Sequence, residues 1–466
     1  MSFDTIQGLG KALREGRTTA REIAGRALAA ARAEPFNAFT AVFEAEALAQ
    51  ADAVDAAFAA GVDLGPLAGV PFAVKNLFDV AGHVTLAGSK IRRGAPPATA
   101  DATAVARLKA AGAVLVGALN MDEFAYGFVT ENAHDGPTRN PHDLARIAGG
   151  SSGGSAAAVS GGILPLTLGS DTNGSIRIPA SLCGVFGMKP TLGRLSRAGT
   201  FPFVHSLDHI GPFTRTAADL AAAYDALQGP DPRDELSPPV ADPLSGRLDA
   251  LAERPLRVGV LGGWFQQGAF PEVVEALEIV ADALQARRDV ELPGAQAARA
   301  AAFAMSASEG GRLHFDDLAA RALDYDPAVR DRLLAGALLP DDVADAARRY
   351  RPVFRDAARK LFEDFDLLLA PVAPCPAPPI GQATMELAGA QVSVRKTLGA
   401  YTQPISYIGL PVIAAPVNRP GKPPVGVQLI APAWREDLAF AAALRLERAG
   451  VIAAHRPPTP AREFKA

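Results

Sequence analysis

Apolar positions in the first sixty residues recur with helical spacing. Thr19 is followed three residues later by Glu22, which is the pattern of a capping box, and an alanine-rich stretch continues to about Ala33. A second helical run lies near Glu44–Ala59. Residues 1–60 are therefore predicted to form an N-terminal helical segment.

From residue 66 onward, short apolar strands alternate with helices. Pro71–Lys75 is an apolar strand, Asp101 is placed to cap a helix that runs to Ala111, and Val114–Gly117 is the next strand. This order is typical of a largely parallel, buried sheet in an α/β fold. Later strands are predicted at Leu256–Gly262, Leu367–Ala370, Pro411–Val417 and Val425–Ile430, and later helices at Pro271–Ala286 and Glu436–Ala449.

One stretch is a good candidate for a boundary within the chain. Gly229–Pro255 combines prolines, charges and small residues. We expect residues 60–235 to form a core, residues 236–365 a helical, variable insertion, and residues 366–466 the C-terminal part of the core domain. The Gly/Ser-rich segment Arg146–Gly162 is not read as a linker, because apolar segments flank it and Ala156–Ser160 is predicted to be helical.

The composition excludes several classes of function. The chain has 466 residues, of which 49% are hydrophobic, and a formal net charge of −4, which gives no electrostatic footprint for nucleic acid or an anionic membrane. Two cysteines give no disulfide framework. We recognise neither a signal peptide nor a run long enough to span a membrane. The expectation is a cytoplasmic enzyme.

Three segments carry residues suited to nucleophilic catalysis. They are a lysine at the end of an apolar strand, Lys75, a Gly/Ser-rich turn, Gly149–Ser155, and a turn of small residues, Gly169–Arg177. Alone, the lysine is more often a surface residue and the glycine-rich turn is an ordinary helix entry. Together they are far more specific than any one of them.

These segments resemble the amidase signature family, whose Gly/Ser-rich core carries two serines with a lysine upstream. The resemblance extends to Asn120–Tyr126, Gly136–Pro141, Cys183–Gly184, Ser206–Pro212 and Pro424–Ile430. It covers residues 60–230 and 365–445, and the middle segment is weaker. It implies the amidase signature fold, a large, twisted, mixed and mostly parallel sheet covered by helices on both faces.

The resemblance also implies a catalytic triad and no cofactor or metal. Ser175 falls on the nucleophile, Ser151 on a bridging serine that takes part in a cis peptide bond, and Lys75 on the general base. A serine hydroxyl needs a base within hydrogen-bond reach, and lysine acts as one only when burial lowers its pKa. Ser151 would relay protons between the other two residues.

Backbone amides of the second turn are the expected oxyanion hole. They belong to Thr172, Asn173, Gly174 and Ser175. Two positions depart from the commoner family pattern. Asn76 stands where many members have aspartate, and Asn173 stands where glycine is commoner, so a side chain projects near the substrate.

A further set of segments also carries a resemblance: Val74–Asp79, Leu86–Lys90, Tyr126–Phe128, Asp171–Ser175, Phe203–Ser206, Gln228–Asp231 and Val260–Trp264. They resemble a subgroup of that family, the 1-carboxybiuret hydrolases of cyanuric acid breakdown, in which both departures are normal. This implies hydrolysis of a small carboxylated urea-type amide with release of ammonia. The related glutamyl-tRNA amidotransferase A subunits read the ammonium of glutamine with an aspartate, where this chain has Gly399. Candidate substrate-binding residues are Tyr126, Arg177 and Arg395, and Arg395 is expected to bind the carboxylate of the substrate.

The same resemblance implies a heterotetramer of two large and two small chains, in which the small chain is a helical accessory subunit. A glutamine amidase subunit of an amidotransferase-like complex and a general aliphatic amidase stay open as alternatives. His205 and His209 have the helical spacing of metal ligands, with Asp208 beside them, but the sequence has no His-Glu-x-x-His motif and its seven histidines are scattered, so a metal site is less favoured. A thiol nucleophile at Cys183 or Cys375 and the Ser-x-x-Lys pattern at Ser393–Lys396 are less favoured.

Overall fold

A central sheet of eleven strands organises the chain. The computed structural model describes residues 5–238 and 243–458. In spatial order the strands of the sheet are β1 (Phe39–Val42), β3 (Val114–Leu119), β2 (Pro71–Lys75), β8 (Leu166–Asp171), β10 (His209–Thr214), β9 (Phe186–Lys189), β16 (Val412–Pro416), β17 (Gly426–Ile430), β13 (Leu367–Pro371), β11 (Val258–Leu261) and β12 (Arg287–Val290). Short two-stranded sheets are formed by β4 (Glu131–Asn132) with β5 (Gly136–Pro137), β6 (Arg139–Asn140) with β7 (Asp143–Ile147), and β14 (Thr384–Leu387) with β15 (Ala390–Ser393).

The sheet is mixed, as predicted. Strands β3, β2 and β8 pair in parallel, and so do β13, β11 and β12. The pairings between and beside these two groups are antiparallel. Parallel pairing is therefore confined to the two groups, where helical crossovers join the strands, whereas short connections such as the one from β16 to β17 return the chain antiparallel.

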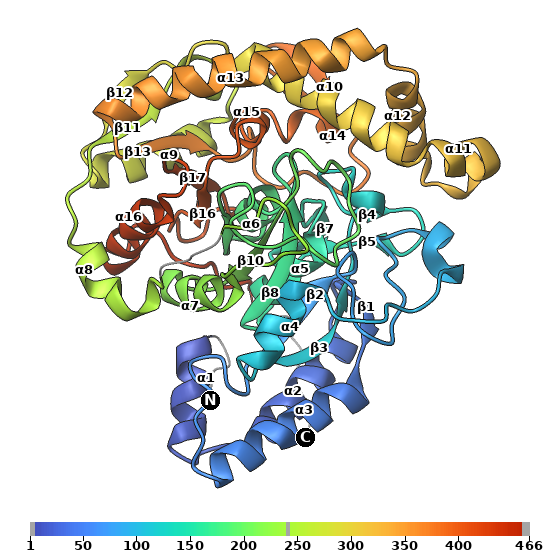
Figure 1. Ribbon diagram of the computed structural model, residues 1–466. Helices are drawn as coiled ribbons and strands as arrows, with labels where there is room; N and C mark the ends of the chain where they lie inside the picture. Colours follow the sequence, from blue (N-terminus) through green and yellow to red (C-terminus); the bar gives the residue numbers. More distant parts are fainter. Residues whose placement is uncertain (1–4, 239–242, 459–466) are drawn as a thin grey trace.

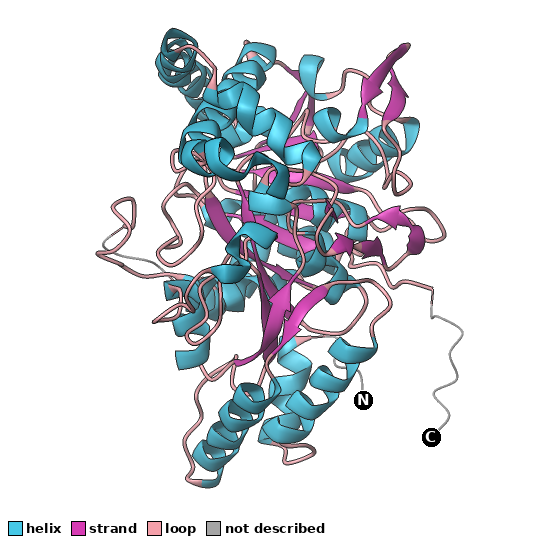
Figure 2. Cartoon of the chain, turned by 90° about the vertical axis from the view of Figure 1, so that its right-hand side faces the viewer, coloured by secondary structure: helices cyan, strands magenta, loops and turns pink. Residues whose placement is uncertain are grey.

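Helices cover both faces of the sheet (Figure 2). They are α1 (Ile6–Arg14), α2 (Ala20–Ala33), α3 (Glu44–Ala59), α4 (Thr103–Ala110), α5 (Gly153–Ser160), α6 (Arg177–Cys183), α7 (Ala217–Leu227), α8 (Leu248–Ala252), α9 (Pro271–Ala283), α10 (Ala295–Leu313), α11 (Phe315–Arg321), α12 (Pro327–Ala337), α13 (Asp341–Asp364), α14 (Val394–Thr397), α15 (Gln403–Tyr407) and α16 (Glu436–Arg448). No helix in the described ranges is long and apolar enough to cross a membrane.

Two hydrophobic cores lie on opposite sides of the sheet. Along β2, Phe72 and Val74 join the core shared with α7 and α16, whereas Ala73 joins the core shared with α2, α5 and α6. Alternate side chains of a strand point to opposite faces, so a strand buried on both sides reads as a continuous apolar run. This explains why Pro71–Lys75 shows no polar alternation.

The N-terminal prediction holds in part. The capping box is present, since Thr19 accepts from the Glu22 amide and Glu22 accepts from the Thr19 amide. Strand β1, which pairs with β3 at the edge of the sheet, was missed because it is short and half-buried. The Asp101 cap was wrong, because its carboxylate accepts from the Ala81 amide and pairs with Lys109 instead.

Helices α10 to α13 form a layer across the upper end of the molecule in Figure 1, while α1 to α3 lie at the lower end. Helix α10 packs on α12, α13 and α15, and α15 leads into the C-terminal strands of the sheet. The segment 236–365 also contributes β11 and β12 to the central sheet. The proposed division into four segments stays a prediction.

Candidate active site

Lys75 ends β2 and is fully buried. Its Nζ donates to Ser151 Oγ at 2.6 Å and to Ser170 Oγ at 2.9 Å. Ser170 lies on the neighbouring parallel strand β8, where Val74 is in register with Leu168. Two adjacent strands therefore bring the amine and a second hydroxyl together at their carboxyl ends.

Burial lowers the pKa of Lys75 to about 7, from its ordinary value of 10.5. The carboxylates of Asp122, Asp171 and Asp208 act in the opposite direction, because negative charge stabilises the protonated amine. Near neutral pH about half of the Lys75 side chains are therefore uncharged. A neutral buried amine can accept a proton from a hydroxyl group in contact with it.

The Gly/Ser-rich turn presents Ser151 to this lysine. The peptide bond between Gly150 and Ser151 is cis, as the family resemblance implied. A Cβ on Gly150 would overlap the carboxylate of Asp122 and lie 2.6 Å from the Val129 amide nitrogen. Only glycine fits at this position, so the turn packs directly on the segment that follows β3.

The second turn is fixed by the carboxylate of Asp171. One oxygen accepts from the Gly174 amide at 2.7 Å, and the other accepts from the Ile176 amide at 3.2 Å. Arg177 donates Nε and Nη2 to the same carboxylate, each at 2.9 Å. Burial would raise the pKa of Asp171, but Arg177 holds it well below its usual range. This carboxylate therefore stays charged and positions Ser175, which is itself buried.

The four amides proposed for the oxyanion hole are not equivalent. That of Gly174 is already bound to Asp171. In the described part of the chain, the amides of Thr172, Asn173 and Ser175 have no protein acceptor, although all three residues are buried. Buried amides are nearly always paired with protein, water or a ligand. Three amides beside Ser175 are therefore available to a substrate oxygen.

A small cavity adjoins Ser175. Its volume is about 20 Å³, enough for about one water molecule, so lining side chains must move before a larger molecule enters. The lining residues are Ala125, Tyr126, Gly127, Phe128, Thr172, Asn173, Ser175, Phe203, Phe303, Ser306, Arg332 and Gln403. Phe303 is 42% exposed, so the cavity reaches the surface at α10.

One cationic side chain, Arg332 of α12, lines this cavity. Its Nη1 donates to the carbonyl oxygen of Tyr126 at 2.8 Å, and its guanidinium lies 3.6 Å from the centre of the Tyr126 ring. Among the described residues, Arg332 Nε and the Tyr126 hydroxyl are buried without a hydrogen-bond partner. Burial lowers the pKa of Arg332, yet a guanidinium remains charged at neutral pH. The cavity therefore offers two unused donors.

The Amidase family model matches residues 24–440. The chain belongs to this family.

Relatives of known function match nearly the whole amidase. It is 53% identical to AtzE, a 1-carboxybiuret hydrolase subunit of Pseudomonas sp. (strain ADP), over 97% of this chain and 98% of that protein. It is 38% identical to the GatA-type chain of the glutamyl-tRNA(Gln) amidotransferase of Synechococcus sp. (strain RCC307), over 96% and 98%. A solved structure, described as a vestigial protein complex that reveals the origins of an s-triazine catabolic enzyme, superposes with a TM-score of 0.95 at 51% identity, covering 97% of this chain and 100% of that one. The chain is an amide hydrolase.

The amidase holds α12 in place through a buried carboxylate of the core. The Asp326 amide, just before the helix, donates to Glu123 Oε2 at 2.7 Å, and Asp326 Oδ2 accepts from the Ala133 amide at 3.0 Å. His134 pairs with the other oxygen of Glu123 at 2.8 Å. These contacts join the helix that carries Arg332 to the loop that carries Tyr126.

The other two predicted substrate-binding residues lie outside the lining of the cavity. Arg177 is fully buried, and besides Asp171 it bonds to Gln428 and Ser406. Its contacts suit positioning of the catalytic turn. Arg395 pairs with Glu131 at 2.6 Å. Sequence reasoning missed Arg332, Ser170 and Ser306. Of these, only Ser170 gave a signal that could have found it, because it lies within the segment of small residues Gly169–Arg177.

The rival sites find little support in the geometry. His205 pairs with Glu235 at the surface, whereas His209 is buried against Lys189 and backbone carbonyl groups. Within residues 5–238 and 243–458, no group of three or more His, Cys, Asp or Glu side chains could hold a metal ion. Burial raises the pKa of both Cys183 and Cys375, which makes neither a ready thiolate.

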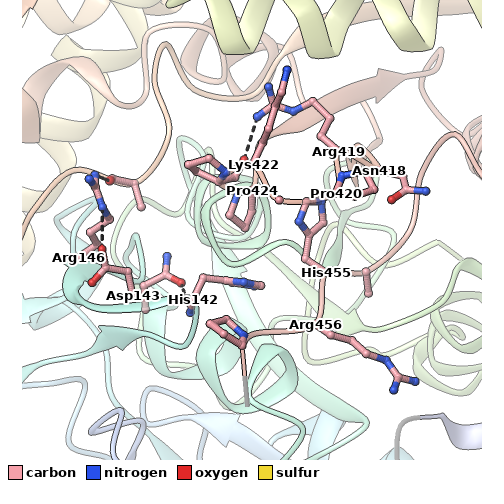
Figure 3. Close-up of a pocket in the computed structure, with 16 residues that line it drawn as sticks. His142, Asp143, Arg146, Asn418, Arg419, Pro420, Lys422, Pro424, His455 and Arg456 are labelled. Carbon is pink, nitrogen blue, oxygen red and sulfur yellow. Dashed lines mark hydrogen bonds and ion pairs between the residues drawn. The ribbon is translucent and has the colours of Figure 1, made fainter. Parts of the chain in front are cut away.

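A second, larger cavity of about 670 Å³ is lined by side chains that include His142, Arg146, Arg419 and His455 (Figure 3). Its lining includes the basic side chains of Arg146, Arg419, Lys422 and Arg456, and three of them are paired: Arg146 with Asp143, and Arg419 and Lys422 with Glu275. None of the residues that line the Ser175 cavity lines this one.

Proposed function

We propose that this amidase hydrolyses 1-carboxybiuret, a small carboxylated urea-type amide, and releases ammonia. The observation that carries the proposal is the buried guanidinium of Arg332 in the same cavity as Ser175. The similarity to a 1-carboxybiuret hydrolase chain over nearly the whole length supports the same substrate. A charged anchor at one end and a nucleophile at the other fit a small anionic amide.

Ser175 is proposed as the nucleophile, Ser151 as the relay and Lys75 as the base. Neutral Lys75 takes the proton of Ser151, which takes that of Ser175 as its Oγ attacks the carbonyl carbon. The proton then returns through Ser151 to the leaving nitrogen, and ammonia departs. Water attacks the ester on Ser175, and the carboxylate product leaves. The 2.6 Å contact between Lys75 and Ser151 supports this order.

The oxyanion of the tetrahedral intermediate would bind the amides of Thr172, Asn173 and Ser175. We omit the Gly174 amide, because it already donates its hydrogen bond to Asp171. Preorganised donors that need no reorientation stabilise the developing charge. Asp171, paired with Arg177, fixes these donors at the required turn.

The substrate carboxylate would bind Arg332 and the Tyr126 hydroxyl. Burial raises the pKa of Tyr126, so its hydroxyl keeps the proton that it donates. We assign this role to Arg332 rather than Arg395, because Arg395 is committed to Glu131. A charge-assisted hydrogen bond to a carboxylate in a buried site is stronger than a neutral one.

Ammonia release from 1-carboxybiuret, generated in situ, tests the proposal. Arg332→Ala should raise KM for this substrate by at least about tenfold, since a lost charged hydrogen bond costs about 1.5–3 kcal/mol. Arg395→Ala is the matched control and should change KM less than threefold. Ser175→Ala should lower kcat by roughly a thousandfold or more. Wild-type protein without activity on 1-carboxybiuret, or an unchanged KM in Arg332→Ala, would refute the assignment.

A glutamine amidase within an amidotransferase-like complex is the alternative, because the glutamyl-tRNA(Gln) amidotransferase chains are 38% identical. Gly399 stands where their sequence places an aspartate that reads the substrate ammonium. A Cβ at Gly399 would lie 2.6 Å from the Phe128 ring. An acidic side chain has no room at this position, so no carboxylate here would bind a substrate ammonium. This favours a carboxylated substrate that has no amino group. A general aliphatic amidase stays open as a third reading and would show no preference for a carboxylate.

A small helical partner and an assembly of two large and two small chains remain our proposal. The solved relative described as a protein complex supports it. So do exposed apolar side chains, many of which fall in one stretch of the described chain: Phe303, Leu313, Phe315, Leu323, Leu334, Leu338, Val343 and Val353. Light scattering on the purified protein, with and without a co-expressed small neighbouring reading frame, measures the assembly. A cytoplasmic location and the absence of direct nucleic-acid binding stay predictions.

A further inference from the structure

The side chain of Asn173 bridges the catalytic turn and α10. Its Nδ2 donates to Ser306 Oγ at 2.7 Å, and Ser306 Oγ donates in turn to the carbonyl oxygen of Ala302, one helical turn earlier, at 2.8 Å. Both residues line the cavity beside Ser175. A residue next to the nucleophile is thereby tied to a helix 133 positions further along the chain.

This chain of hydrogen bonds fixes which way the amide of Asn173 is turned. A serine hydroxyl has one hydrogen, and that of Ser306 is used on the Ala302 carbonyl. Toward Asn173 the hydroxyl can only accept, so the amino group must face α10. The carbonyl oxygen Oδ1 of Asn173 is consequently turned away from Ser306.

Asn173 Oδ1 is buried and has no hydrogen-bond partner among the described residues. A buried acceptor left unpaired is costly, so such an atom beside a nucleophile calls for a donor from the ligand. The donor must be an N–H or O–H group of the substrate. The oxygen of the scissile carbonyl is excluded, because it has no hydrogen and faces the backbone amides.

We propose that Asn173 Oδ1 accepts the N–H on the acyl side of the scissile carbonyl, and so selects urea-type amides over carboxamides. The inference rests on the proposed function of this site and deepens it. The leaving nitrogen must face Ser151, from which it receives a proton. The other atom bonded to the carbonyl carbon, on the acyl side, is then the one that faces Asn173. In a urea-type substrate that neighbour is N–H, and in glutamine or an aliphatic amide it is CH₂.

Two stable acids that differ only at this position serve as probes. N-carbamoylglycine carries NH beside the reacting carbonyl, and succinamate carries CH₂ with the same carboxylate. For each enzyme variant, the ratio of kcat/KM on the two acids measures recognition of the N–H. Differences in intrinsic reactivity cancel when the variant's ratio is divided by that of the wild type.

Asn173→Ala keeps the backbone amide and removes the acceptor. It should lower the ratio about tenfold to a hundredfold, because the N–H of N-carbamoylglycine loses its acceptor whereas succinamate has no N–H at that position. Ser306→Ala should lower the ratio by a smaller factor, because the amide of Asn173 is then free to turn. The control is Ser308→Ala, the same change on the same helix outside the cavity lining, which should leave the ratio unchanged.

The outcomes separate this inference from the proposed function. Equal losses on both acids, or no loss on either, in Asn173→Ala would overturn the role of Oδ1. A fall in the ratio supports the inference whatever the physiological substrate is. If wild-type protein ignores 1-carboxybiuret while the ratio still falls in the variant, only the proposed function is refuted.

Discussion

In the proposed mechanism Lys75 must be neutral before it can accept a proton from Ser151, and its burial sets the pH at which this happens. The lysine is neutral above its pKa, which lies at about 7. The kcat/KM of the amidase should therefore rise with pH and level off above this value. For the free enzyme, kcat/KM reports the pKa of the essential base.

The size of the change follows from the pKa. With a value of about 7, roughly one tenth of the lysines are neutral at pH 6 and roughly nine tenths at pH 8. An ordinary lysine, with a pKa of 10.5, would be neutral in only about 0.03% of molecules at pH 7. Burial thus increases the working fraction of the base about a thousandfold.

Asp122→Asn tests the electrostatic part of this reasoning. The Asp122 carboxylate raises the pKa of Lys75, so its neutralisation should move the acid limb of the profile to lower pH, by roughly one unit. Asp345→Asn, on the exposed face of α13, is the control and should leave the profile unchanged. Initial rates of ammonia release from N-carbamoylglycine between pH 5 and pH 9 give both profiles.

Two results would refute the argument. One is a rate that is flat between pH 6 and pH 8, since Lys75 would then not be the group that titrates. The other is a profile in Asp122→Asn that moves to higher pH, because the removal of negative charge cannot favour a protonated amine.

Two further predictions concern residues that position the site. Arg177→Ala leaves the Asp171 carboxylate buried without its partner and should lower the free energy of unfolding by about 3–5 kcal/mol, measured as a lower urea midpoint. The exposed pair of Arg359 with Asp356 is the control, and Arg359→Ala should lower the free energy of unfolding by about 1 kcal/mol or less. An unchanged midpoint in Arg177→Ala would count against this role. Ser170→Ala removes one of the two hydrogen bonds of Lys75 and should lower kcat roughly tenfold to a hundredfold. Ser170→Thr keeps a hydroxyl and should restore the rate. If it does not, the hydroxyl of Ser170 is not the group that positions Lys75.

Much of the fold follows from apolar runs that are buried on both faces of the sheet. Segments such as Pro71–Lys75 and Val114–Leu119 can be recognised as buried strands, because a strand covered on both faces must be apolar along its whole length. The pairing partners of the C-terminal strands could not be predicted in this way. Their order depends on contacts across hundreds of residues, which local periodicity does not encode. The edge strand β1 escaped notice because half-buried residues give a weak pattern.

Sequence reasoning could propose residues for the reacting end of the site, but not for the end that we propose selects the substrate. Ser151 and Ser175 stand in segments rich in glycine, whose unusual backbone conformations require that residue, and Lys75 ends an apolar strand. Arg332 stands in an amphipathic helix among other arginines, and nothing in the local pattern separates it from a solvated residue. Its role depends on where α12 lies, which is set by the packing of Val329 and Leu333 in the core and by the contact of Asp326 with Glu123.

Helices α10 and α12 pack on the rest of the molecule through apolar side chains such as Met305 and Leu333, while Ser306 and Arg332 line the cavity, and this has a consequence for how such enzymes diversify. Ser306 and Arg332 can be exchanged without any change in the segments that hold the nucleophile, so new preferences can arise while the reaction itself is preserved. This separation permits a gradual change of substrate during evolution, because each ancestral enzyme along the way can still cleave an amide. A library confined to the cavity-facing positions of these two helices should accordingly yield many active clones with altered preference.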